Sequence, residues 1–159
     1  MDTTERNNFL KTAVDLSLTG SEQGHGGPFG ALVVKDGKII GRGFNRVLSS
    51  NDPTAHAEIV AIREACTTLD SFQLTGCEIF SSCEPCPMCL GAIYWARPEK
   101  VYFASTRQDA AGAGFDDALI YEEIVLPFSD RTIPMSYVPL QEALEAFEKW
   151  KSNPDKSLY

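Results

Sequence analysis

The hydrophobic pattern of this chain changes repeatedly between the periods of a helix and of a strand. Apolar residues at roughly helical spacing predict a helix over 4–19, which Gly20 is expected to end. The apolar run 29–34 predicts a strand. Asp36 and Gly37 are a strong signal for a two-residue hairpin turn, with 38–45 as the returning strand. Because a hairpin pairs its strands antiparallel, at least part of the sheet is antiparallel.

Helices and strands alternate along the rest of the chain. Thr54 is expected to cap a helix, and Pro85 and Pro87 flank the start of another, since proline is tolerated in a first helical turn. Strands that alternate with helices of about ten to fifteen residues predict an α/β fold layered around a mixed sheet. The expected helices are 55–69, 86–96 and 141–151, and the expected strands are 77–81, 100–104 and 133–138.

Composition places the chain among ordinary globular proteins. Its 159 residues are 43% hydrophobic and 23% charged, and they are expected to form one domain over 1–159. The formal net charge of −8 disfavours a nucleic-acid partner, because such binding depends on Lys and Arg to neutralise phosphates. No apolar run reaches the roughly eighteen residues that cross a membrane, so no membrane partner is expected.

The cysteines are crowded in one short stretch. Three of the five, Cys83, Cys86 and Cys89, lie within seven positions. Such crowding indicates metal ligation rather than disulfides, and the N-terminus lacks an apolar leader. Both features predict a cytoplasmic protein.

Two short motifs carry the candidate chemistry: His56-Ala57-Glu58 and a Cys86-x-x-Cys89 pair. An imidazole and two thiolates are ligands that zinc prefers, and three protein ligands leave the fourth tetrahedral position to water. Cys86 and Cys89 are one helical turn apart, so both sulfurs can reach one ion. Glu58 is then free to act as a general base beside that water.

Two other interpretations use the same residues. The cysteines could be buried by chance, with His56 a capping residue. Cys83 and Cys86 also form a C-x-x-C pair, which is typical of a redox dithiol. The preferred interpretation of Cys83 is a partly buried structural thiol at the end of a strand.

The two motifs together resemble the H-x-E…P-C-x-x-C signature of zinc nucleobase deaminases. Longer stretches resemble bacterial guanine deaminases, and plant guanosine deaminases share much of them; these stretches are 26–31, 51–58, 82–98 and 113–117. The resemblance implies the cytidine deaminase-like fold, a three-layer α/β/α sandwich with a central mixed five-stranded sheet. It also implies one Zn²⁺ per subunit and a homodimer, with exchange of C-terminal segments between subunits as an option.

The resemblance assigns roles residue by residue. It implies that zinc is held by His56, Cys86 and Cys89, and that Glu58 and Asp117 are catalytic. Asp116 is the adjacent alternative to Asp117. The implied substrate-binding residues are Phe29, Asn45, Ala57, Trp95 and Tyr159, and 140–159 forms a C-terminal helix and tail that can cover an active site. For Tyr159, a frayed tail is the alternative.

The implied reaction is hydrolysis of guanine, a small purine base, to xanthine and ammonia. A carboxylate at Asp117 suits guanine, because guanine presents N–H donors at N1 and at its exocyclic amine and a carboxylate only accepts. The rivals within this class are guanosine, cytosine, a triazine and, disfavoured by the charge, tRNA adenosine. A non-catalytic zinc protein is the rival from another class.

Overall fold

The chain folds into two compact units, Met1–Asp117 and Ala118–Tyr159, in a computed structural model that describes residues 2–158. The first unit is built on one sheet with the strand order β2-β1-β3-β4. β1 pairs antiparallel with β2 and with β3, whereas β3 and β4 are parallel, so the sheet is mixed as predicted. The strands are β1 (Gly30–Lys35), β2 (Lys38–Phe44), β3 (Cys77–Cys83) and β4 (Lys100–Ser105).

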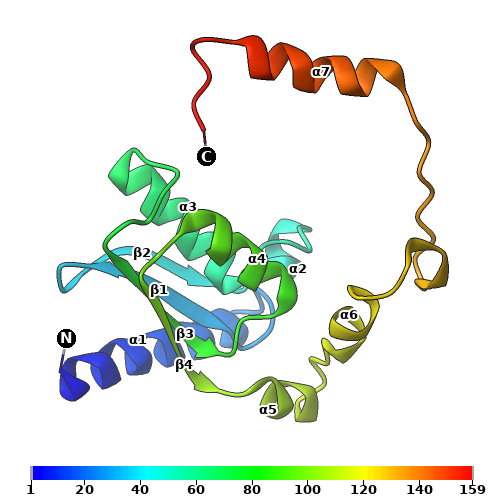
Figure 1. Cartoon of the computed structure of the whole chain (residues 1–159). Helices are drawn as coiled ribbons and strands as arrows, with labels where there is room; N and C mark the ends of the chain where they lie inside the picture. The colour runs from blue at the N-terminus through cyan, green and yellow to red at the C-terminus, as the bar shows by residue number, and fades with distance from the viewer. Residues whose placement is uncertain (1, 159) are drawn as a thin grey trace. The chain divides into compact units, whose positions relative to one another are not determined.

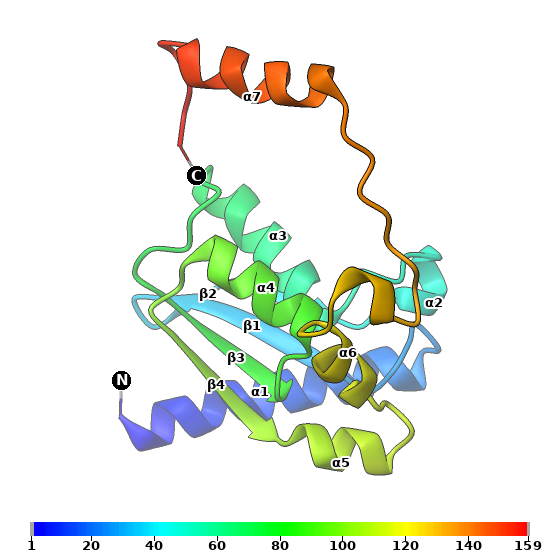
Figure 2. The ribbon, with the colours of Figure 1, turned by 45° about the vertical axis from the view of Figure 1, so that its right-hand side comes forward.

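Helices cover both faces of this sheet. α1 lies along one face, and α3 and α4 lie on the other (Figures 1 and 2). Along β1 the side chains alternate between two cores: Ala31 and Val33 face α3 and α4, whereas Leu32 and Val34 face α1. The predicted α/β/α layering is therefore correct. The helices of this unit are α1 (Thr3–Glu22), α2 (Val47–Ser50), α3 (Ala57–Leu69), α4 (Pro87–Ala96) and α5 (Arg107–Gly112).

The second unit contains α6 (Ala118–Glu123), the 3₁₀ turn η1 (Phe128–Asp130) and α7 (Gln141–Ser152). α7 confirms the helix predicted over 141–151. The strand predicted over 133–138 is absent, and the sheet has four strands within residues 2–158 rather than the expected five. Pro134 gives a physical reason, because proline cannot donate a hydrogen bond to a neighbouring strand. Within the described residues, no helix combines the length and the apolar character that a membrane crossing needs.

Two predicted helix ends were wrong, and packing explains both. Gly20 does not end α1 but lies inside it, where an added Cβ would come within 2.7 Å of the Phe44 ring. Thr54 does not cap α3; it donates to Asp52 instead, and His56 is the N-cap residue. The hairpin prediction was correct, since Asp36 and Gly37 both have positive φ, at 49° and 72°.

β2 approaches the backbone of α3 closely through two glycines. A Cβ at Gly43 would overlap the carbonyl oxygen of Ala57, and a Cβ at Gly41 would overlap that of Ala61. Ala57, Ala61 and Ala65, on the facing side of α3, are fully buried. Because these two glycines lack side chains, the first turn of α3 packs directly against β2. This contact fixes the positions of His56 and Glu58.

Gly43→Ala is expected to lower the free energy of unfolding by about 1–3 kcal/mol, because the added methyl meets backbone that cannot rotate away. Zinc content should fall as well, since the first turn of α3 must move. Chemical denaturation and metal analysis test this. Gly91→Ala, inside α4 with open space at its Cβ, is the control and should be neutral or slightly stabilising. Equal stability of the two variants would refute this account of β2.

Candidate active site

One edge of the sheet carries most of the predicted site residues, namely Asn45, His56, Glu58, Cys86 and Cys89. β2, β3 and β4 point in the same direction, because β2 and β3 are each antiparallel to β1 and β4 is parallel to β3. Their carboxyl ends therefore meet where β1 begins. In open α/β sheets, this edge is where ligands bind. Asn45 follows β2, and α3 and α4 start at the same edge.

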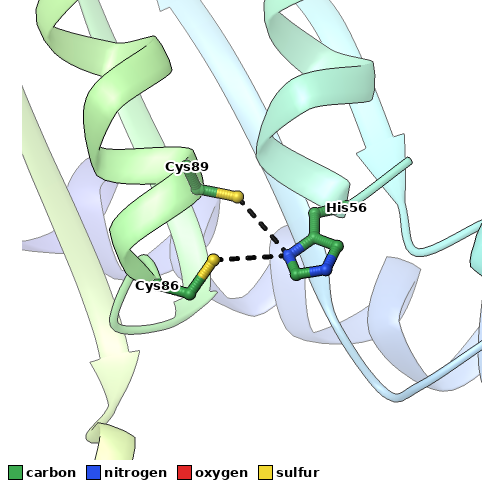
Figure 3. A group of neighbouring side chains, drawn as sticks. All are labelled: His56, Cys86 and Cys89. Atoms are coloured by element: carbon green, nitrogen blue, oxygen red, sulfur yellow. Dashed lines mark hydrogen bonds between the residues drawn. The ribbon is translucent and has the colours of Figure 1, made fainter. Parts of the chain in front are cut away.

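His56 and Cys86 occupy equivalent places in two different helices. His56 is the N-cap of α3 and Cys86 the N-cap of α4, both have extended backbone, and neither side chain caps its own helix. Both side chains are thus available to a ligand. Cys89 lies one turn into α4, and Figure 3 shows both sulfurs directed at Nδ1 of His56.

The distances fit a tetrahedral zinc ion. Cys86 Sγ and Cys89 Sγ are each 3.5 Å from His56 Nδ1, and all three ligand atoms lie within 4.8 Å of one another. Zn–S bonds of about 2.3 Å and a Zn–N bond of about 2.0 Å at tetrahedral angles place sulfur and nitrogen about 3.5 Å apart. The three side chains can therefore bind one ion without rearrangement.

The protonation of these ligands also suits a metal. The pKa of Cys86 is lowered to about 4, chiefly because Cys89 donates to its sulfur and also because of His56. The pKa of Cys89 is raised, because its thiol is the donor in that pair and is buried. The hydrogen bond with Cys86 raises the pKa of His56. Cys86 is thus a thiolate at neutral pH, and a cation between the sulfurs would displace the proton of Cys89.

Glu58 lies beside the ligand cluster and is almost fully buried, at 5% exposure. Its Oε2 is 3.4 Å from Cys89 Sγ, and its Oε1 accepts a hydrogen bond from Ser81 Oγ at 3.2 Å. Burial raises the pKa of Glu58, because a low-dielectric environment disfavours the charged form. A carboxyl group in this state can both accept and return a proton.

Asn45 is buried and its amide orientation is fixed. Its Oδ1 accepts from the backbone N–H of Val47 at 3.1 Å, so its NH₂ group is the part that can donate to a ligand. A Cβ at Gly26 would overlap the same Oδ1. Gly26 therefore makes room for the Asn45 side chain, a steric reason for a glycine in this loop.

Asp117 is partly buried, whereas its neighbour Asp116 is exposed. Partial burial raises the pKa of Asp117, and so does the negative charge of Cys86, which lies close enough to act on it. Phe115, two residues earlier, meets Phe29 edge to face with ring centroids 5.0 Å apart. Phe29 in turn packs on the core beneath α3, so this contact fixes the segment that carries Asp117.

The other predicted substrate-binding residues are Ala57, Trp95 and Tyr159. Neither Ala57 nor Trp95 belongs to the cluster around His56. Ala57 is fully buried at the first position of α3, where a helix leaves amide groups without intrahelical partners. Trp95 is 63% exposed and lies six residues after Cys89 in α4. That spacing turns it about 120° around the helix from Cys89, so Trp95 does not join the cluster. Tyr159 lies outside the described residues.

Ser81 and Phe115 contact predicted site residues but were not themselves predicted from the sequence. Phe115 lies within a stretch that carries the resemblance, so the signal was present. Ser81 gave no signal, because a serine in a strand is informative only when its partner is known.

The comparisons with known proteins agree with this geometry. Residues 3–105 match the family described as the cytidine and deoxycytidylate deaminase zinc-binding region, so the chain belongs to this zinc-binding deaminase family. Its residues His56, Cys86 and Cys89 are positioned to hold one metal ion.

Individual members of this deaminase family show which enzymes the chain is similar to. The chain is 56% identical to the guanine deaminase of Bacillus subtilis over 151 residues, which are 95% of this chain and 97% of that protein. It is 37% identical to the tRNA-specific adenosine deaminase of Aquifex aeolicus over 91% of this chain and 95% of that protein. The crystal structure of a Bacillus subtilis guanine deaminase matches with a TM-score of 0.95 and 54% identity, covering 100% of this chain and 99% of that one.

The zinc content of two cysteine variants distinguishes a metal ligand, Cys89, from a structural thiol, Cys83. Cys89→Ser is expected to lose bound zinc and activity, because a hydroxyl does not replace a thiolate as a ligand. Cys83→Ser should keep its zinc, since Cys83 Sγ donates to the carbonyl of Thr106 at 3.5 Å. Burial also raises the pKa of Cys83, as expected of an inert thiol. Metal analysis after dialysis is the measurement, and zinc loss from Cys83→Ser would contradict the assignment.

Proposed function

We propose that this protein hydrolyses guanine to xanthine and ammonia. The observation that carries the proposal is the buried Glu58 carboxyl, 3.4 Å from Cys89 Sγ, in a site where residues 2–158 provide three side chains placed to hold a metal ion. A structural zinc site needs no such carboxyl group and normally has four protein ligands. The 56% identity to a guanine deaminase supports the purine base as substrate.

Each residue has a defined task in this reaction. Zinc bound by these ligands supplies a water-derived nucleophile at neutral pH. Glu58 accepts the proton of the attacking water and delivers it to ring nitrogen N3 of guanine as the bond to C2 forms. Glu58 then takes the remaining proton from the new C2 hydroxyl and, with Asp117, passes it to the exocyclic amine. The C–N bond breaks, ammonia departs, and C2 becomes a carbonyl carbon of xanthine.

Recognition of the base follows from donors and acceptors. The NH₂ group of Asn45 can donate to an acceptor atom of the purine, since its Oδ1 is occupied by Val47. Asp117 accepts from the N–H groups of guanine, and adenine has no N1–H to offer. Phe29 and Ala57 line the inner wall of the substrate site. Trp95 joins this wall when residues 140–159 cover it.

Guanine is favoured over the rival substrates by the relatives and by the charge. Deamination of tRNA adenosine is supported by 37% identity to such an enzyme. That reaction requires binding of a polyanion, which a net charge of −8 opposes. Guanosine, cytosine and triazines stay alternatives that a substrate panel separates.

The metal-quantified protein is expected to convert guanine faster than guanosine, cytosine or adenine, as followed by ultraviolet absorbance. Glu58→Gln should keep its zinc and lose at least about 100-fold in kcat, because general acid–base catalysis contributes about 10²–10⁴-fold. Preference of the wild type for another substrate would refute the substrate assignment. Near wild-type turnover by zinc-loaded Glu58→Gln would refute the role of Glu58.

We also propose that the protein works as a cytoplasmic homodimer in which residues 140–159 cover the active site of the other subunit. α7 carries an apolar stripe formed by Leu144, Phe147 and Trp150, at 57%, 65% and 43% exposure. A helix of this pattern normally buries that stripe. The five unpaired cysteines fit a reducing compartment. Tyr159 is the proposed end of the cover.

Mixing two inactive variants tests the exchange. Glu58→Gln has an intact tail, whereas deletion of 153–159 leaves Glu58 intact and removes the end of the covering segment. If tails cross between subunits, co-refolded variants should recover about one quarter of the wild-type rate, since half of the dimers are mixed and one site in each is complete. A mixture no more active than the sum of its parts would show that each tail serves its own subunit.

A further inference from the structure

Ser81 is a polar residue on an otherwise apolar face of β3. Side chains alternate along a strand, and Cys77 and Ile79, which share the face of Ser81, belong to the core beneath α3 and α4. Ser81 itself is 2% exposed. A hydroxyl in such a place is costly unless it has a hydrogen-bond partner, so the identity of that partner indicates what the position does.

The partner of Ser81 is Glu58. Ser81 Oγ donates to Oε1 of Glu58 at 3.2 Å, and Oε2 of the same carboxyl lies 3.4 Å from Cys89 Sγ. The two oxygens therefore have different neighbours. One is held by a hydroxyl group of the sheet, and the other faces a zinc ligand.

Rotation about the last bond of a glutamate side chain is weakly restricted, because this torsion joins an sp³ to an sp² carbon. A single directed donor can therefore decide which oxygen points where. Since β3 is a central strand, bonded to β1 on one side and β4 on the other, the position of Ser81 is rigid. A donor on such a strand is well placed to orient a carboxyl on the neighbouring helix.

We propose that Ser81 is a positioning residue for Glu58: its hydroxyl holds Oε1, so that Oε2 is the oxygen presented to the zinc ligands and the substrate. This inference rests on the proposed function, in which Glu58 carries protons. Loss of an outer hydrogen-bond partner of this kind typically lowers activity by about 10–100-fold.

Ser82 provides a matched control on the same strand. It is the next residue, is also buried at 7% exposure, and points to the opposite face of the sheet. Its Oγ accepts a hydrogen bond from the backbone N–H of Gly30 at 3.0 Å, which ties β3 to the start of β1. Removal of this hydroxyl also disrupts a buried hydrogen bond, but one that does not involve Glu58.

Ser81→Ala, Ser81→Thr and Ser82→Ala, each loaded with zinc, test the proposal by steady-state kinetics. Ser81→Ala is expected to lower kcat by about tenfold or more, with KM and zinc content near wild type. Ser81→Thr keeps the hydroxyl group and should have a kcat near that of the wild type. Ser82→Ala should lower the melting temperature but leave kcat unchanged. A wild-type kcat in Ser81→Ala, or an equal loss in Ser82→Ala, would overturn the proposal.

A second readout needs neither substrate nor turnover. The infrared difference between wild type and Glu58→Gln isolates the carboxyl band of Glu58. Ser81→Ala should shift this band and Ser82→Ala should not. An unchanged band in Ser81→Ala overturns the inference about Ser81, whereas failure of the wild type to deaminate guanine overturns the proposed function and leaves the infrared test intact. The spectrum also decides the case if the added methyl of Ser81→Thr prevents folding.

Discussion

The whole site depends on two helix N-termini held at the same edge of one sheet. His56 and Cys86 are N-cap residues, so the positive ends of both helix dipoles point toward the ligand cluster and favour a thiolate there. The N-terminus of α3 is held there by its close approach to β2 at Gly41 and Gly43. The metal centre is therefore a consequence of backbone packing, and the ligand side chains need little freedom to reach it.

A second constraint is the burial of polar groups behind the metal ligands. Glu58 lies beside an apolar core cluster, and a carboxyl group there is tolerable only with hydrogen-bond partners. Its Oε1 accepts from Ser81 Oγ, and its Oε2 lies 3.4 Å from Cys89 Sγ. The same burial that raises its pKa gives it the proton affinity that general acid–base chemistry needs. Burial of Glu58 therefore bears both on the stability of the fold and on the proton transfer proposed for this residue.

The sequence was most informative where chemistry restricts residue type. The cluster of His56, Cys86 and Cys89 could be predicted, because few residue types bind zinc and the spacing of the two cysteines matches one helical turn. Local signals were misleading in two places: Gly20 lies inside α1 against Phe44 rather than at the helix end, and 133–138, which contains Pro134, forms no strand. Ser81 could not be predicted, because its meaning depends on α3, which lies over the sheet but 23 residues away along the chain.

The central claim is that zinc has three protein ligands, two of them sulfurs. X-ray absorption spectroscopy at the zinc edge of the purified protein tests it most directly. The account predicts two sulfur neighbours at about 2.3 Å and two nitrogen or oxygen neighbours at about 2.0 Å, one from His56 and one from water. A third sulfur in the first coordination sphere would contradict it, because Cys83 would then fill the position that the reaction requires for water.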